Sequence, residues 1–392
     1  MIETLVELYD ERPLENVLSV QVFSPGRVVY VCPRNVSKDG KKQRDIKNYL
    51  RMKGYKGDIR FVQADMYSTK DVLRALREIS ARYPAPVLDI TGGTDQALFA
   101  GGVISGEMDM PAFTYSRRGN KFFSINDAPF GEELPCDVSL SVEDCFLMAG
   151  GAVKKGRVDN AVLGSYMSIY EPFFELFMRF KRSWTSIINW MQRASAPVNG
   201  VIYLDVDSSR ALRGENGMIH INEDALIQLE DIGMLKNLKL GDPNRVSFSF
   251  RDAQIRQWLR DVGSVLETMV YKTCLDLKVF DDVCTSVVVD WQGDLKQGNI
   301  TNELDVMATK GIMPVFISCK TCPIRTEALN ELSVLRDRFG GKIARAAIVS
   351  ASSCQVITRH RAQELDISVI DLEDLKGGRL ASRLKSLSKS VG

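Results

Sequence analysis

The sequence predicts an α/β protein built from two principal modules, an N-terminal Rossmann-like domain and a C-terminal mixed α/β domain. Short β-branched runs alternate with helical stretches over roughly the first hundred residues. A second set of strands and helices follows residue 250. The length of 392 residues also exceeds what one typical core supports, so a modular chain is expected.

The first strands are expected at residues 2–8, 27–32, 59–63 and 87–90. Helices are expected at 13–23 and 39–52, after Ser68, and from Gln96. This alternation is typical of a largely parallel sheet with helices on both faces. Two further runs, 113–115 and 121–125, indicate a hairpin that closes a domain of residues 1–135.

Residues 136–250 are expected to join the modules. The segment 136–163 reads as a connector, and 166–194 reads as helical. In that helical stretch, an aromatic stripe has the spacing of a packing face, which we favour over a nucleic-acid stacking surface: Phe173, Phe174, Phe177 and Phe180. Residues 221–250 resemble a small helix and hairpin, possible parts of a winged element.

The last domain is expected to span residues 251–392. A long helix from Phe250 to Leu277 should precede three strands, at 283–291, 302–308 and 313–319. A helix at 325–339 and a strand at 344–350 should follow.

Composition excludes several classes of protein. Lys plus Arg (51) nearly equal Asp plus Glu (50), so an anionic partner must be met by local patches. No run approaches the about 20 apolar residues of a membrane span, and eight scattered cysteines are typical of reduced thiols, which predicts a cytoplasmic protein without a membrane partner. Two isolated histidines and a lone Cys319–Cys322 pair disfavour histidine-based catalysis and structural zinc.

A glycine-rich loop follows the expected fourth strand. Ligands of open parallel sheets bind beyond the carboxyl ends of the strands, where backbone amides can hold phosphate. The candidate ligand-binding residues at this edge are Asp10, Arg34, Thr91, Gly92, Gly93, Thr94 and Arg117. A plain glycine turn is about equally compatible with the loop. The absence of GxGxxG and GxxxxGK[ST] disfavours an NAD enzyme or a P-loop NTPase, so a sensed nucleotide is expected.

Acidic and basic residues cluster in the second module. Strand alternation places Glu303 and Asp305 on one face, and Lys320 ends the next strand after a buried run. Glu267 on the preceding helix is a third candidate carboxylate. Such a set can hold a divalent cation and a phosphate together, although a surface salt-bridge network is the alternative.

Taken together, these segments resemble the CRISPR-associated Rossmann-fold (CARF) effectors that carry a C-terminal PD-(D/E)XK nuclease, a restriction-endonuclease-like α/β domain. The resemblance is carried by TGGT at residues 91–94 and by GSVLE, VVVDW, NELDVM, PVFISCK, ALNEL and FGGKIAR between about 250 and 350. It implies a homodimer that binds cyclic oligoadenylate, usually cyclic tetra-adenylate, and an endonuclease of type III CRISPR antiviral defence that cleaves DNA or RNA with Mn²⁺ or Mg²⁺.

The resemblance also implies roles for individual residues. Asp305 matches the motif's first acid, Lys320 its lysine, and Glu267 the acid on the preceding helix. Ser318 stands where the second acid would be, so Glu303 and the Cys319 carbonyl are expected to complete the metal shell. The alternatives are a non-catalytic, nucleotide-responsive DNA-binding regulator, and a sensor that degrades its own messenger through Thr91 or Thr94.

Overall fold

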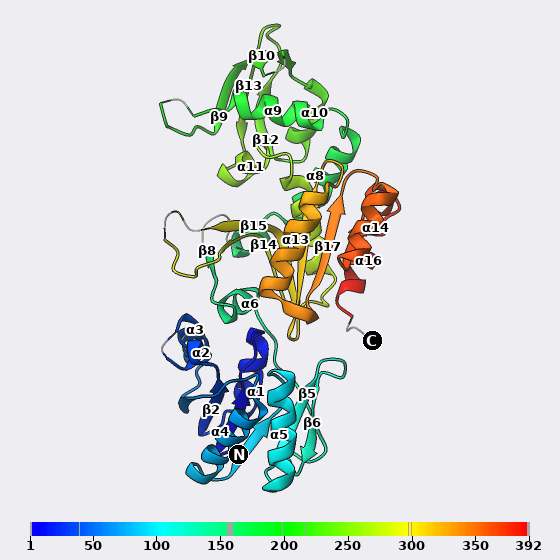
Figure 1. The fold of residues 1–392 in the computed structure, drawn as a ribbon. Helices are drawn as coiled ribbons and strands as arrows, with labels where there is room; N and C mark the ends of the chain where they lie inside the picture. The colour runs from blue at the N-terminus through cyan, green and yellow to red at the C-terminus, as the bar shows by residue number, and fades with distance from the viewer. Residues whose placement is uncertain are drawn as a thin grey trace.

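The computed structural model describes residues 2–38, 40–154, 160–197, 199–215, 217–296, 298 and 300–389. Three bodies are stacked along one axis (Figure 1). The N-terminal sheet lies at one end, the C-terminal sheet in the middle, and a smaller body formed by the middle of the chain at the other end. No helix among these residues is long and apolar enough to cross a membrane.

The N-terminal sheet has seven strands in the order β3-β2-β1-β4-β5-β6-β7. Its strands are β1 (Thr4–Leu8), β2 (Arg27–Cys32), β3 (Asp58–Gln63), β4 (Pro86–Asp89), β5 (Ala112–Ser116), β6 (Lys121–Asn126) and β7 (Glu133–Pro135). The first five are parallel, and β6 and β7 add antiparallel strands at one edge. The chain order reverses between β1 and β4, which is where a doubly wound sheet binds ligands.

Helices cover both faces of this sheet: η1 (Pro13–Asn16), α1 (Leu18–Phe23), α2 (Arg34–Ser37), α3 (Lys41–Met52), α4 (Thr69–Arg82) and α5 (Asp95–Glu107). The expected cap is present, because the Ser68 hydroxyl accepts a hydrogen bond from the Asp71 amide. The single helix expected over 13–23 is wrong. It divides into η1 and α1 at Val17, whose backbone leaves helical geometry (φ −131°, ψ −20°).

The smaller body combines helices with short antiparallel strands. Its helices are α8 (Met167–Arg179), α9 (Trp184–Ala194) and α10 (Glu223–Asp231). Its strands are β9 (Asp205–Ser209), β12 (Leu235–Lys239) and β13 (Arg245–Phe250) in one sheet, with a hairpin of β10 (Ala211–Gly214) and β11 (Gly217–His220). The packing interpretation of the aromatic stripe is confirmed, because Phe173 and Phe177 are buried edge-on against Trp184.

The central sheet has six strands in the order β18-β17-β16-β15-β14-β8. They are β8 (Ala152–Lys154), β14 (Asp282–Asp290), β15 (Thr301–Lys310), β16 (Met313–Lys320), β17 (Arg345–Ser350) and β18 (Ile367–Ile370). The sheet is antiparallel from β8 to β16 and parallel from β16 to β18. The expected connector therefore supplies an edge strand, β8, to the C-terminal module.

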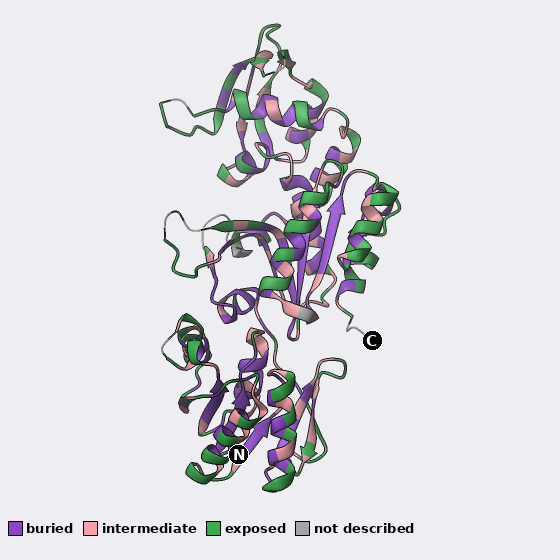
Figure 2. Cartoon of the chain, in the orientation of Figure 1, coloured by how far each residue is buried: buried purple, intermediate pink, exposed green. Residues whose placement is uncertain are grey.

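The helices around this sheet are α6 (Val142–Met148), α7 (Asn160–Gly164), α12 (Ser264–Asp276), α13 (Thr326–Phe339), η2 (Gly341–Ile343), α14 (Val356–Glu364), α15 (Leu372–Lys376) and α16 (Leu380–Leu387). Helix α11 (Ala253–Trp258) contacts β13 of the smaller body. Strands are buried and outer helix faces exposed (Figure 2). The long helix expected from Phe250 to Leu277 is wrong. It breaks into α11 and α12, and Asp261 between them accepts hydrogen bonds from the Gly263 amide and the Ser264 hydroxyl.

Candidate functional site

The predicted acids and lysine of the second module meet at one end of the central sheet. Asp305 lies on β15, Lys320 is the last residue of β16, and Glu267 lies in the first turn of α12. Leu304 and Val306 are buried, whereas the side chains of Glu303 and Asp305 are more exposed, as strand alternation predicts. All four predicted residues contribute to the same region, and Glu267, Glu303, Asp305 and Lys320 line a cleft of about 500 Å³.

Asp305 is held from the neighbouring strand by three groups. Its Oδ2 accepts hydrogen bonds from the Ser318 hydroxyl at 3.0 Å and from the Cys319 amide at 2.5 Å. The Lys320 ammonium lies 3.7 Å from the same oxygen. Ser318 therefore does not replace an acid in charge, but its hydroxyl orients the carboxylate of Asp305.

Carboxylates outnumber cationic side chains among the described residues that line this cleft. Burial, reinforced by the charges of Asp305, Asp261 and Glu303, raises the pKa of Glu267 to about 9. Burial also raises the pKa of Asp305, although Lys320, the Cys319 amide and Ser318 oppose this shift. Lys320 is the one cationic side chain among the described residues that line the cleft itself, so the donor set is compatible with an additional cation.

A divalent cation fits this donor set only with help from other oxygen ligands. Among the described His, Cys, Asp and Glu side chains, no three converge closely enough to hold a metal ion by themselves. Mg²⁺ commonly takes one or two protein carboxylates and completes its octahedral shell with water and substrate phosphate. Two carboxylates at this edge of the sheet are therefore compatible with such a metal.

Asp261 is a functional candidate that we did not predict. It lines the cleft together with Glu267 and also lines a second cavity, of about 590 Å³, that shares Glu267 and Glu303. Its position in the break between α11 and α12 explains the omission, because a continuous helix was expected there. The only signal in the sequence was the Gly263 that follows it two residues later.

The strand-end loop of the N-terminal sheet lies at the predicted place, between the ends of β1 and β4. Its polar groups are largely used within the protein. The Asp10 carboxylate accepts hydrogen bonds from the Gly93 amide at 2.9 Å and from the Arg12 guanidinium. Burial opposes ionisation of Asp10, but these hydrogen bonds outweigh it and lower its pKa. Gly92 packs so closely on Glu15 and Asp10 that a Cβ there would lie within 3.0 Å of both side chains.

The two threonines of this loop are also engaged. Thr91 accepts a hydrogen bond from the Tyr115 amide at 2.8 Å. Thr94 caps α5, since its hydroxyl accepts from the Ala97 amide, and it donates to the Met66 carbonyl. The loop is thus an ordered structural turn, and a ligand there would meet groups that already have partners.

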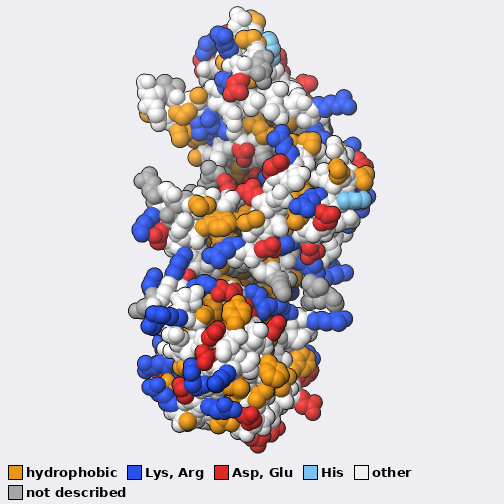
Figure 3. Space-filling model, viewed as in Figure 1, with side chains coloured by type: hydrophobic (Ala, Val, Ile, Leu, Met, Phe, Trp, Pro, Cys, Tyr) orange, Lys and Arg blue, Asp and Glu red, His pale blue; other side chains and the backbone are white. Residues whose placement is uncertain are grey.

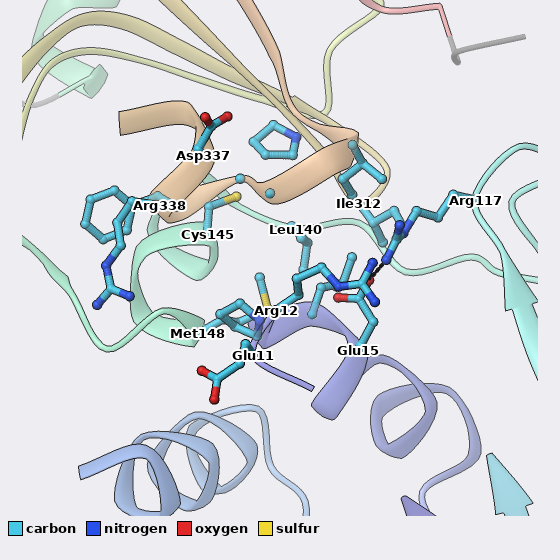
Figure 4. A pocket seen from close by; sticks show the side chains of 17 residues that line it. Glu11, Arg12, Glu15, Arg117, Leu140, Cys145, Met148, Ile312, Asp337 and Arg338 are labelled. Atoms are coloured by element: carbon cyan, nitrogen blue, oxygen red, sulfur yellow. Dashed lines mark ion pairs between the residues drawn. The ribbon is translucent and has the colours of Figure 1, made fainter. Parts of the chain in front are cut away.

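The two predicted arginines differ in their surroundings. Arg34 begins α2 and is exposed. Arg117 forms an ion pair with Glu15. Arg117 and Glu15 line a cavity of about 180 Å³ between the N-terminal and central bodies, and Figure 4 shows Asp337 and Arg338 across it. Sequence alone did not indicate this cavity, because its two sides are about 200 residues apart in the chain.

Direct contacts also join these two bodies. The Lys41 ammonium at the start of α3 donates to the carbonyls of Gly150 (3.1 Å) and Gln292 (2.9 Å). Lys53 forms an ion pair with Asp144 at 2.9 Å. Helix α3 of the N-terminal body is therefore in direct contact with α6, with the turn that follows α6 and with the connection that follows β14.

The fold combines a Rossmann-like sheet at one end of the molecule with an acid-and-lysine cleft in a second sheet. Residues 256–391 match the family described as Card1-like, endonuclease domain. The endonuclease domain expected at the C-terminal end is confirmed by this match. A comparison with curated proteins finds no match.

Two solved structures are similar over nearly the whole chain. Protein VC1899 from Vibrio cholerae is 17% identical, with a TM-score of 0.74, covering 98% of this chain and 97% of that one. Can2 from Sulfobacillus thermosulfidooxidans, solved in complex with cyclic tetra-adenylate (cA4), is also 17% identical, with a TM-score of 0.74 and coverage of 99% and 100%. The predicted fold class, an α/β protein with a Rossmann-like N-terminal domain followed by a second α/β domain, is confirmed by these similarities.

Proposed function

We propose that the protein is a metal-dependent endonuclease that cyclic tetra-adenylate activates in type III CRISPR defence. The observation that carries this proposal is the cleft in the endonuclease domain, where the buried carboxyl groups of Asp305 and Glu267 lie together beside Lys320. The activator is supported by the similarity to Can2, whose structure contains cA4. A homodimer is part of the proposal, as the resemblance to CARF effectors implies.

In this proposal, Asp305 and Glu267 hold Mg²⁺ or Mn²⁺, with Glu303 and the Cys319 carbonyl as further oxygen donors. The bound cation would supply an acidified water molecule and stabilise charge on the phosphate. Lys320 would stabilise the negative charge that develops on the scissile phosphodiester. Ser318 and the Cys319 amide keep the Asp305 carboxylate turned toward the cleft.

Activation would use α13 as a rigid connection between the two sites. Ala328, Glu331, Leu332 and Leu335 of this helix line the catalytic cleft, whereas Asp337 and Arg338 line the cavity beside the N-terminal body. Its 14 residues span about 20 Å. A ligand that displaced Arg12 from Asp10 would disturb the neighbouring Arg117–Glu15 pair and so shift one end of α13.

The ligand-binding set proposed for the first sheet is Asp10, Arg34, Thr91, Gly92, Gly93, Thr94 and Arg117. Arg34 and Arg117 would supply positive charge to the messenger's phosphates. Because Asp10, Thr91 and Thr94 already have partners, messenger binding would exchange hydrogen bonds rather than fill vacant ones. Such an exchange changes conformation only if the messenger binds the two states with different affinity.

The test is cleavage of supercoiled plasmid, single-stranded DNA and RNA with Mn²⁺, Mg²⁺ or chelator, with and without cA4. Wild type is compared with Lys320→Ala and with Lys310→Ala, a lysine at the opposite end of the same sheet. We expect cutting that requires metal and cA4, is lost in Lys320→Ala and is kept in Lys310→Ala. Binding of cA4 with no cleavage of any substrate would instead support the nucleotide-responsive regulator.

A further inference from the structure

Two acidic side chains lie in the core of the N-terminal sheet. Glu7 on β1 and Asp89 on β4 are aligned in neighbouring parallel strands, and their exposed fractions are 2% and 1%. Because aligned residues of neighbouring strands point to the same face of a sheet, the two carboxyl groups share one environment. Leu5 and Phe113, which flank them on this face, are fully buried. The two acids therefore sit together in a mainly apolar core.

These acids have no positive charge beside them. Within the part of the chain that the structure describes, neither carboxyl group forms an ion pair with a lysine or arginine, and Glu7 Oε1 accepts no hydrogen bond. Asp89 is held by two neutral donors, the Ser19 hydroxyl on α1 and the Thr91 amide, the latter at 2.7 Å. Two carboxylates in apolar surroundings cannot both ionise at low cost, so the pair retains at least one proton.

The two acids differ in how readily they ionise. Burial, reinforced by the charge of Asp89, raises the pKa of Glu7 well above its usual value. Burial raises the pKa of Asp89 only to about 6, because Ser19 and Thr91 oppose the shift. Tyr30 on β2 also faces the pair, and burial and the charges of these acids raise its pKa, so it stays neutral. At neutral pH Glu7 therefore carries the proton and Asp89 the negative charge.

Asp89 is directly connected to the loop proposed to bind the messenger. It is the last residue of β4, and one of its two donors is the backbone amide of Thr91, which begins the 91–94 loop. Lys and Arg side chains gather on the surface of the N-terminal body, where they would attract an anion (Figure 3). A phosphate bound by this loop would bring negative charge to the end of β4 and compete with Asp89 for the loop amide. Both effects disfavour the Asp89 anion.

We propose that a proton is a second ligand of this site: when a phosphate-bearing messenger binds at residues 91–94, the Glu7–Asp89 pair takes up one proton from solvent. This inference rests on the proposed binding of a cyclic oligoadenylate and adds a linkage to pH. The proton neutralises Asp89, so the pair no longer opposes the charge of the messenger. Linkage requires the reverse effect as well, so a lower pH should strengthen messenger binding.

Other groups of the N-terminal body are less suited to this exchange. Residues 1–135 contain no histidine, the side chain that most often titrates near neutral pH. Burial opposes ionisation of Asp10 beside the loop, but hydrogen bonds, chiefly from Arg12, outweigh it and lower the pKa of Asp10. Glu15, at the same strand ends, forms an ion pair with Arg117. Proton uptake near neutral pH is therefore assigned to the buried pair.

The test counts the protons that binding takes up. Full-length protein is titrated with cA4 in a calorimeter near neutral pH, in buffers such as PIPES and Tris that differ in their enthalpy of ionisation. The slope of the observed binding enthalpy against the buffer enthalpy gives the number of protons. We expect uptake of up to about one proton, and a Kd that rises up to about tenfold per pH unit above about pH 6.

Asp89→Asn is the decisive variant, because it keeps the size of the side chain and an oxygen for the Thr91 amide but cannot ionise. It should bind cA4 without taking up a proton and with an affinity that is independent of pH. Glu7→Gln imitates the protonated acid and should keep the uptake. Asp65→Asn, an exposed acid in the loop after β3, is the matched control and should behave as wild type.

Equal binding enthalpies of wild type in all buffers would overturn the proposal, and so would full proton uptake by Asp89→Asn. If Asp89→Asn does not fold, the buffer dependence of wild type still decides. Absence of cA4 binding at every pH would remove cA4 as the ligand and this proposal with it. Because the measurement uses neither metal nor nucleic acid, a protein that never cleaves would count against the nuclease and not against the proton uptake.

Discussion

At the strand ends of the N-terminal sheet the polar groups hold one another, whereas in the cleft of the central sheet the carboxylates repel one another. Asp10 is stabilised as an anion by Arg12 and Gly93, and its pKa is lowered. Glu267 is surrounded by other acids, and its pKa is raised to about 9. The first region is complete as a structural turn, and in the second the described carboxylates outnumber the cationic side chains that line the cleft. Chemistry is therefore expected in the cleft, and rearrangement in the turn.

Removing the carboxylate of Asp305 should have the largest effect on cleavage. Asp305→Asn removes a proposed metal ligand but keeps the shape of the side chain. We expect cleavage to fall by more than about a hundredfold, while binding of cA4, measured by calorimetry, is unchanged. Asp281→Asn is the control, because Asp281 immediately precedes β14 and contacts Lys310 at the far end of β15. Full cleavage by Asp305→Asn would remove this residue from the chemistry.

The raised pKa of Glu267 predicts a pH dependence. Between its ordinary value of 4.5 and about 9, the folded chain holds a proton that the unfolded chain has lost. The stability of the metal-free protein should therefore fall as pH rises through this window. A bound cation requires the ionised carboxylate of Glu267 and should offset this loss of stability. Cleavage at subsaturating Mn²⁺ should therefore rise up to about tenfold per pH unit from pH 6 to 8.

Melting temperatures in chelator and in Mn²⁺, measured across the same pH range, check the sign. The stabilisation by Mn²⁺ should grow with pH in wild type and become flat in Glu267→Gln. A melting temperature in chelator that depended on pH in the same way in wild type and in Glu267→Gln would show that Glu267 is not the buried acid described above.

Ser318 should have a smaller effect, because it is one of three groups that hold Asp305. Ser318→Ala removes a hydrogen bond of 3.0 Å but leaves the Cys319 amide and Lys320 in place. We expect a loss of about fivefold in kcat, equivalent to one ordinary hydrogen bond. Ser318→Thr keeps the hydroxyl and should retain activity. Equal losses in both variants would point to packing rather than to this hydrogen bond.

The smallest expected effect concerns communication between the two regions. Lys41→Ala removes two hydrogen bonds from the N-terminal body to the Gly150 and Gln292 carbonyls. The stimulation of cleavage by cA4 should fall about threefold, a part of an ordinary coupling energy, while cA4 affinity changes by the same factor or less. Lys70→Ala, on the exposed face of α4, should leave the stimulation intact. Unaltered stimulation in Lys41→Ala would place the coupling elsewhere, with α13 as the next candidate.

Features set by local sequence patterns were predicted better than features that depend on long-range contacts. Alternation along β15 was enough to place Glu303 and Asp305 on one face, and strand ends were enough to bring the 91–94 loop beside Asp10. The hydrogen bond between Asp10 and Gly93 joins residues 83 positions apart, so no local pattern reports it. The break before Gly263, which exposes Asp261, was hidden because apolar periodicity continues across it.

The smaller body is inserted in the sequence between two neighbouring strands of the central sheet, since β8 precedes it and β14 follows it. Residues of α11, together with Ile202, line the cavity that also contains Glu267 and Glu303. A relative could therefore exchange this inserted body, and with it the molecules admitted to the cleft, without altering Asp305, Lys320 or the strands that carry them. Substrate choice and bond cleavage would then reside in separate parts of one chain, and each part could change independently of the other.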